Sequence, residues 1–194
     1  MSYRDLKSYE QATIIYDFTV EFCNRYIEAN KSYKSYPSYK FYSRMSDQML
    51  QAARSGKQNI VEGSSERTSK KGELKLLGVS RASFQELLED YEDFLRQRGL
   101  EQWSKDDPRS LEIRNISYKS NRTYKTYKSY LENPESAANT AICLINQVNF
   151  LLDRQIKSLE NQFIKQGGYS ENLFWKRENE KKKRLVNSLW RKQQ

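Results

Sequence analysis

The chain has 194 residues, of which 30% are charged and 37% hydrophobic, a length that suits one packed domain with extensions. It has no histidine, which excludes the usual general base at neutral pH and the commonest zinc ligand. Lysine and arginine number 34 against 25 aspartate and glutamate residues, and the net charge of +9 fits a polyanionic partner or a lysine-rich solvated surface equally well.

The first predicted helix covers residues 6–29, and the second covers residues 43–62. In both, apolar residues alternate at spacings of three and four, which is typical of the buried seam of a helical bundle. The first seam consists of Tyr9, Thr13, Tyr16, Val20, Cys23 and Ile27. The second consists of Met45, Met49, Ala52, Gly56 and Asn59 or Ile60. The small residues of the second helix indicate a close neighbour, and Gly63 is predicted to end it in a left-handed backbone conformation.

The third predicted helix begins after Thr68 or Ser69, either of which can cap it, and ends near Gly99. A short connection joins it to the second helix, so these two helices should be antiparallel neighbours. Its seam consists of Leu74, Leu77, Arg81, Phe84, Leu88, Tyr91 and Leu95. Arg81 interrupts this apolar stripe with a charge.

The fourth predicted helix has the clearest start, because Asn133 can cap it, Pro134 suits its first position and Glu135 complements its dipole. Two glycines at positions 167 and 168 should end it. Its seam consists of Ala138, Ile142, Ile145, Asn149, Leu152, Ile156, Leu159 and Phe163. Residues 100–132 are too many for a plain loop, so part of them should be extra structure or mobile.

A weaker fifth helix is predicted over residues 171–192, outside the bundle. Together these elements predict an all-α fold, an antiparallel up-down four-helix bundle over residues 1–168 with an insertion at about 100–132. A basic amphipathic helix over residues 169–194 follows it.

Cys23 and Cys143 lie among apolar helical residues, which predicts buried thiols rather than a disulfide. No secretion signal or membrane-length apolar run is present, so we expect a cytoplasmic protein without a membrane partner.

Two segments, residues 31–44 and 117–130, place tyrosines at every third position among lysines and arginines. Basic charge neutralises phosphates and tyrosines stack on unpaired bases, so the pattern is compatible with contact with single-stranded or looped RNA. A polar loop of biased composition explains the same pattern. The candidate nucleic-acid contacts are Arg54, Lys57, Arg67, Lys70, Lys71, Lys75, Lys125, Lys128, Lys181, Lys182, Lys183 and Arg184.

The amphipathic tail also fits self-association, partner binding or, less well, an acidic membrane surface. The third helix is acidic, with Glu86, Glu89 and Asp90 among its charges, and a molecule with acidic and basic faces suits head-to-tail rings. The same charges fit a solvated helix face.

No phosphate-binding glycine loop, no serine or cysteine paired with histidine, and no Glu-x-x-His motif occurs. We therefore expect a non-enzymatic protein without a cofactor or metal.

Residues 51–88, QAARSGKQNIVEGSSERTSKKGELKLLGVSRASFQELL, resemble a bacterial family of four-helix bundles. The family includes the protein encoded in 23S ribosomal RNA intervening sequences and the accessory variability determinant of diversity-generating retroelements. The matching residues are Ala52, Ala53, Ser55, Asn59, Ile60, Glu62, Gly63, Arg81, Ala82, Ser83, Glu86 and Leu87. Val61 and Ser80 stand where alanine is usual. Residues 139–169 resemble the branch that carries a C-terminal suffix segment.

The resemblance implies a homo-oligomer, a pentameric barrel in the retroelement branch, with a basic surface that engages RNA and a reverse transcriptase. It also gives Arg81 a role, because an inward arginine could pair with Glu62 across the second and third helices and fix their register. The leading prediction is therefore a nucleic-acid-binding accessory protein, with RNA or DNA as its partner. The alternative is a protein–protein scaffold without a nucleic-acid role.

Overall fold

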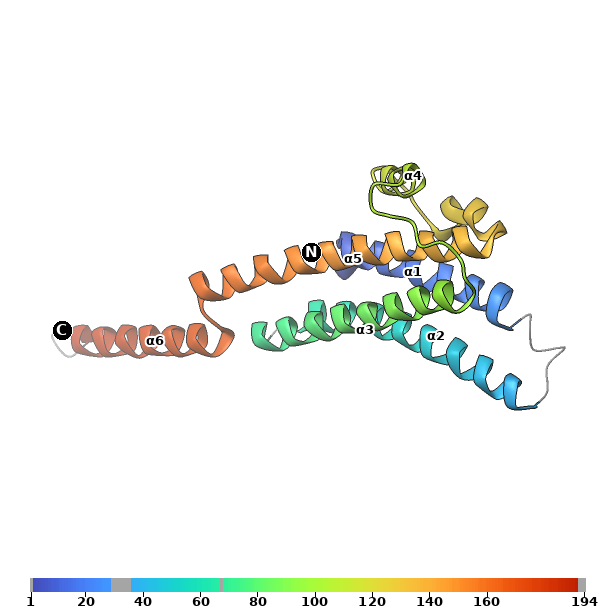
Figure 1. The fold of residues 1–194 in the computed structure, drawn as a ribbon. Coiled ribbons are helices and arrows are strands. Elements are labelled where there is room, and N and C mark those ends of the chain that lie inside the picture. The colour runs from blue at the N-terminus through green and yellow to red at the C-terminus, as the bar shows by residue number, and fades with distance from the viewer. Residues whose placement is uncertain (1, 29–35, 67, 192–194) are drawn as a thin grey trace.

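The computed structural model describes residues 2–28, 36–66 and 68–191, with the backbone alone at residues 28, 36–43 and 189–191. Most of these residues are helical and no β-strand occurs among them, so the predicted all-α class is confirmed (Figure 1). The elements are η1 (Tyr3–Asp5), α1 (Lys7–Phe22), the π-helical η2 (Cys23–Glu28), α2 (Tyr36–Ser65), α3 (Lys70–Gln97), α4 (Pro108–Ile116), the 3-10 helix η4 (Tyr124–Glu132), α5 (Pro134–Gln166) and α6 (Tyr169–Arg191).

Helices α1, α2, α3 and α5 pack around a common core, and we call these four helices the helical body. Each contacts the next in the order α1, α2, α3, α5 and back to α1, and neighbours run antiparallel (Figure 1). Buried aromatic rings pack against one another in this core: the ring centroid of Phe22 lies 4.8 Å from those of Tyr91 and Phe94, both edge-on. The buried Tyr91 hydroxyl donates to Thr19 Oγ1 at 3.0 Å, so this polar group keeps a hydrogen-bond partner inside the core.

The helix ends follow the predicted capping residues with one exception. Ser69 caps α3 by accepting from the Gly72 N–H, and Asn133 caps α5. Gly99 and Gly167 follow α3 and α5 in left-handed conformations, with φ of 63° and 69°. Gly63 does not end α2, which continues to Ser65. Gly63 is buried instead, and a Cβ there would lie 3.4 Å from the Glu73 carbonyl oxygen, so it allows α2 and α3 to approach.

The buried face of α1 differs from its predicted seam. Tyr9, Thr13, Tyr16 and Val20 are only half-buried, whereas Cys23 and Ile27 are buried as predicted. The reason is that α1 packs against α2, α5 and η4 at once, so it needs a broad apolar face rather than a narrow stripe. The fully or almost fully buried apolar residues of α1 are Ala12, Ile14, Ile15, Phe18 and Phe22.

Residues 100–132 form α4 and η4, which fold back over α5, with η4 also contacting α1 (Figure 1). Ile113 of α4 and Tyr127 and Leu131 of η4 are fully buried, so this insertion extends the core. Asn139 of α5 fixes the irregular segment that precedes α4. Its side chain accepts a hydrogen bond from the Trp103 N–H and donates one to the Glu101 carbonyl, both at 2.8 Å. The insertion is therefore ordered extra structure, one of the two predicted outcomes.

Helix α6 leaves α5 at Gly167 and runs beyond the end of the helical body (Figure 1). Over residues 169–188 its side chains are exposed, apart from a half-buried Glu178. Its 23 residues correspond to a rod about 35 Å long. Within the described ranges, none of the helices combines the length and the apolar composition that crossing a membrane requires.

Candidate nucleic-acid interface

The predicted contacts around the α2–α3 turn are mostly solvent-accessible. Arg54, Lys71 and Lys75 are exposed, whereas Lys70 is half-buried and its Nζ donates to Gln162 Oε1 at 3.1 Å. Lys57 is turned toward α1, with its Nζ 4.1 Å from the Tyr16 ring centroid, a cation–π distance. Arg67 lies outside the described residues. The hydrogen bond from Lys70 places this turn beside the C-terminal part of α5.

The four predicted contacts in α6 are all exposed. Lys181 pairs with Glu178 at 2.7 Å and Arg184 with Glu180 at 3.3 Å, both within the helix. In the part of the chain that the structure describes, no carboxylate lies within salt-bridge distance of Lys182 or Lys183. These two exposed ammonium groups are therefore not held in a salt bridge by any described carboxylate.

Helix α6 begins at the same end of the helical body as the α2–α3 turn (Figure 1). Glu171 anchors its first turn by accepting from the Gly168 N–H at 2.9 Å. We call Lys70, Lys71 and Lys75 together with α6 the basic end. The α2–α3 turn and α6 thus share one end of the helical body, although the four predicted contacts of α6 lie farther out along that helix.

Lys125 and Lys128 belong to η4, which packs near the start of α5 at the opposite end of the helical body. Helix α5 has 33 residues and is about 50 Å long, so these lysines cannot share one short site with the basic end. The tyrosines of η4 are not fully available for stacking on bases either, because Tyr127 is fully buried and Tyr124 and Tyr130 are half-buried. Burial also raises the pKa of Tyr130 to about 12.

The predicted buried pair of Glu62 and Arg81 is wrong. Glu62 is exposed, and Arg81 donates from Nε to Asp153 Oδ1 of α5 at 2.6 Å, with side chains 40% and 53% exposed. Arg81 lies on the rim of α3 that faces α5 rather than on the α2 side, because Ser80 and Phe84 already fill the contact with α2. The charge therefore interrupts the apolar stripe without entering the core.

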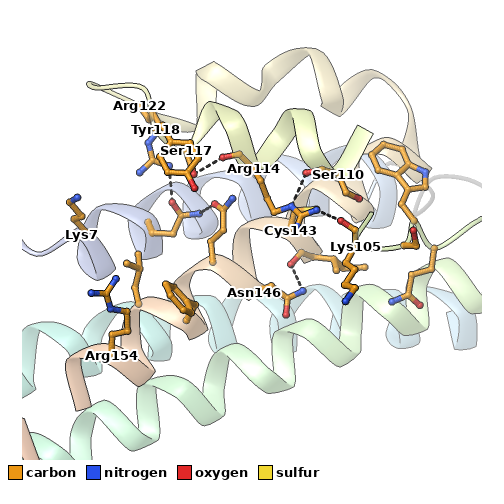
Figure 2. Close-up of a pocket in the computed structure, with 18 of the residues that line it drawn as sticks. Lys7, Lys105, Ser110, Arg114, Ser117, Tyr118, Arg122, Cys143, Asn146 and Arg154 are labelled. Atoms are coloured by element: carbon orange, nitrogen blue, oxygen red, sulfur yellow. Dashed lines mark hydrogen bonds between the residues drawn. The ribbon is translucent and has the colours of Figure 1, made fainter. Parts of the chain in front are cut away.

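A cleft of about 800 Å³ lies between α1, α4 and α5, and sequence reasoning did not find it (Figure 2). Five basic side chains and one acidic one, Glu92, line it. We call it the basic cleft, and its cations are Lys7, Lys105, Arg114, Arg122 and Arg154. Three of them come from the insertion at residues 100–132 and the other two from α1 and α5, so no local spacing could have revealed the whole cluster.

A second, smaller groove lies between α2 and α3 and carries the opposite charge. Glu86 and Asp90 line it together with polar residues such as Gln51 and Ser83. Burial, together with the neighbouring carboxylates of Asp93 and Glu86, raises the pKa of Asp90 to about 6. The acidic stretch of α3 is thus partly enclosed in this groove. A cation bound there would stabilise the charged form of the Asp90 carboxylate.

No cluster of three or more potential metal-ligating His, Cys, Asp or Glu side chains occurs among the residues described here. Cys23 is buried and Cys143 is half-buried, and the two do not form a disulfide with each other.

Known protein families, curated proteins and solved structures contain no match to this chain. The resemblance to the bacterial four-helix-bundle family therefore stays a prediction, and the function has to be argued from the geometry.

Proposed function

We propose that this protein is a non-enzymatic accessory protein that binds nucleic acid, in particular RNA, through its basic end. The observation that carries the proposal is that α6, with its exposed Lys182 and Lys183, projects from the end of the body at which the α2–α3 turn lies. In this proposal residues 1–168 form an antiparallel four-helix bundle and residues 169–194 form a basic arm. The protein acts in the cytoplasm.

The chemistry of the basic end fits phosphate neutralisation rather than base reading. Its cations lie on exposed helix surfaces, and lysine ammonium groups on flexible stems attract phosphates as point charges. Binding should therefore tolerate many sequences and weaken steeply with salt, because each neutralised phosphate releases condensed counterions. Arg54 and Lys57 lie farther along α2 and are secondary contacts in this proposal.

The accessory role follows from the family resemblance. We propose that the protein works with an RNA-handling enzyme such as a reverse transcriptase, or with ribosomal RNA, and that it does so as a homo-oligomer, with five subunits the favoured number. An oligomer would bring several basic ends together, and multivalent contact raises the apparent affinity for a long polyanion.

The test is fluorescence anisotropy with labelled single-stranded RNA at low salt, using the complete protein. The Lys71→Gln/Lys75→Gln variant should weaken binding by about tenfold, since two exposed phosphate contacts are removed. Lys125→Gln/Lys128→Gln removes the same charge at the other end and serves as the matched control, with an expected change below twofold. Absence of binding to RNA and DNA by the unaltered protein would remove the proposal.

A protein–protein scaffold is the second candidate, and the apolar residues of α6 favour it. Leu173, Phe174, Trp175, Leu185 and Val186 are between 44% and 62% exposed, which is unusual for an amphipathic helix without a partner. The acidic α2–α3 groove of a neighbouring copy offers a surface of opposite charge. Truncation after Gly168, followed by light scattering, distinguishes the roles: loss of the oligomer with RNA binding retained favours the scaffold.

A further inference from the structure

We propose that the basic cleft binds one phosphorylated nucleotide unit, with Arg122 and Gln147 supplying hydrogen-bond donors to its phosphate. This site is separate from the basic end and goes beyond the proposed function. The proposal rests on the hydrogen bonds that fix these two side chains, on the charge of the cleft and on its exposed aromatic rings (Figure 2).

A chain of hydrogen bonds sets the orientation of two glutamine side chains beside the cleft. Arg122 Nη1 lies 2.9 Å from Gln11 Oε1, and a guanidinium can only donate, so this atom of Gln11 must be its carbonyl oxygen. The Gln11 amide nitrogen then donates to the Leu144 carbonyl and to Gln147 Oε1, both at 3.2 Å. The Gln147 amide group is thereby forced to turn its nitrogen away from Gln11.

Two nitrogen donors are left without an acceptor by this arrangement. In the described part of the chain, neither Gln147 Nε2 nor Arg122 Nε has a hydrogen-bond partner, although both atoms are shielded from solvent. The Arg122 side chain is only 8% exposed, and its other nitrogens contact Gln11, Tyr127 at 3.3 Å and Glu10 at 3.4 Å. Buried polar atoms without partners are rare in folded proteins, so these donors point to an acceptor that enters the cleft.

The charge of the cleft specifies what kind of acceptor this is. Lys7 and Arg154 are exposed at its edge, and together with Arg122 they lie on the same side of the cleft in Figure 2. Glu92 is the one acidic residue of the lining, and Glu10 offsets part of the charge of Arg122. The surplus of positive charge favours a dianion over a monoanion, and phosphate combines that charge with several acceptor oxygens.

The apolar parts of the lining specify the rest of the ligand. Tyr118 is 87% exposed and Phe150 is 61% exposed, and both rings border the cleft. Exposed aromatic rings beside a phosphate site can stack on a base, an interaction that any nucleobase can make. A volume of about 800 Å³ falls within the range of small-molecule sites, so a nucleotide unit fits, either free or within a strand.

Because Gln147 Nε2 and Arg122 Nε are shielded from solvent, the lining side chains must turn slightly toward the ligand when it binds. Binding therefore satisfies donors that the free protein leaves unpaired, and it should stabilise the fold. A thermal shift on adding adenosine 5′-monophosphate gives a first readout, and calorimetry gives the affinity. Adenosine and inorganic phosphate are the control ligands, each carrying one half of the proposed ligand.

The decisive variant is Gln147→Glu, which is nearly isosteric. It keeps the oxygen that accepts from Gln11 but replaces the unpaired donor with a carboxylate oxygen that repels phosphate. We expect adenosine 5′-monophosphate to bind at least about tenfold more tightly than adenosine, and Gln147→Glu to remove that difference. Lys7→Gln/Arg154→Gln changes exposed residues only and should weaken binding by about tenfold, whereas Lys125→Gln/Lys128→Gln should not.

A 5′-phosphorylated oligonucleotide identifies the source of the nucleotide. If Gln147→Glu weakens its binding, the cleft receives a residue of a strand; if only the mononucleotide responds, the cleft receives a free nucleotide. Equal affinity for adenosine and its monophosphate, no binding of either, or an unchanged affinity in Gln147→Glu overturns the proposal. Lys182→Gln/Lys183→Gln tests the basic end independently, so the two proposals can fail separately.

Discussion

Ser80 of α3 donates its hydroxyl hydrogen to the carbonyl oxygen of Gly56 on α2 at a distance of 2.7 Å. Both residues are buried, and the contact exists because the two helices approach closely at Gly56. A Cβ on Gly56 would lie 2.7 Å from Cε2 and Cζ of Phe84, well inside van der Waals contact. Ser55 and Ser83 form a second hydroxyl contact at 2.9 Å, so small residues define the α2–α3 interface.

Replacing Gly56 with alanine should destabilise the protein by about 1–3 kcal/mol, because the fully buried Phe84 ring has no space into which it can retreat. Gly78→Ala is the matched control: Gly78 is exposed in the middle of α3, and a Cβ there meets nothing within 4 Å. This variant should gain about 0.5–1 kcal/mol from helix propensity. Urea denaturation of both variants measures the difference, and a stabilised Gly56→Ala protein would contradict the close approach.

Asp90→Asn should stabilise the protein at neutral pH but not in acid. The folded state raises the pKa of Asp90 to about 6 from its ordinary value of 3.8, so the folded state binds the proton more tightly than the unfolded state. Wild-type stability should therefore fall as the pH rises from about 4 to about 6, and the variant should lack this decrease. After allowance for solvent screening of this half-buried group, we expect a gain of about 1 kcal/mol at pH 7.

Thermal melts of Asp90→Asn from pH 4 to pH 8 measure this effect. Glu89→Gln removes an exposed carboxylate of the same helix and controls for net charge. Parallel curves for wild type and Asp90→Asn across the whole pH range would show that Asp90 is solvated like an ordinary surface carboxylate.

The ion pair between Arg81 and Asp153 should contribute less than about 1 kcal/mol, because both side chains are about half exposed. A double-mutant cycle with Arg81→Leu and Asp153→Asn gives the coupling energy directly. A second cycle with Arg81→Leu and Glu62→Gln should give none, since Glu62 is exposed and Arg81 pairs with Asp153. Destabilisation above about 3 kcal/mol by Arg81→Leu alone would instead indicate a buried pair.

The parts of the fold that local chemistry determines were predictable from the sequence. Ser69 and Asn133 cap α3 and α5 because their side-chain oxygens accept hydrogen bonds from the next N–H groups along the chain. Gly167 ends α5 because a left-handed residue closes the helix there. Such signals act within a few residues, so no knowledge of the tertiary structure is needed to recognise them.

The misjudged parts depend on contacts between distant segments. Gly63 looks like a helix end in sequence, but its lack of a side chain accommodates Glu73 and Leu76 of α3 instead. The inward face of α1 depends on the insertion, since η4 covers a side of α1 that a plain four-helix arrangement would leave in solvent. The basic cleft could not be predicted for the same reason. Lys7, Arg122 and Arg154 come together only when the insertion folds back over α5.

The salt dependence of RNA binding tests the central claim most directly. A plot of log K against log salt for a single-stranded RNA has a slope of about −0.7 for each phosphate contact. Lys182→Gln/Lys183→Gln should reduce the magnitude of that slope by about 1.4, while Lys125→Gln/Lys128→Gln leaves it unchanged. An equal slope in all three proteins, or no RNA binding at low salt, would contradict a role for the basic end in nucleic-acid binding.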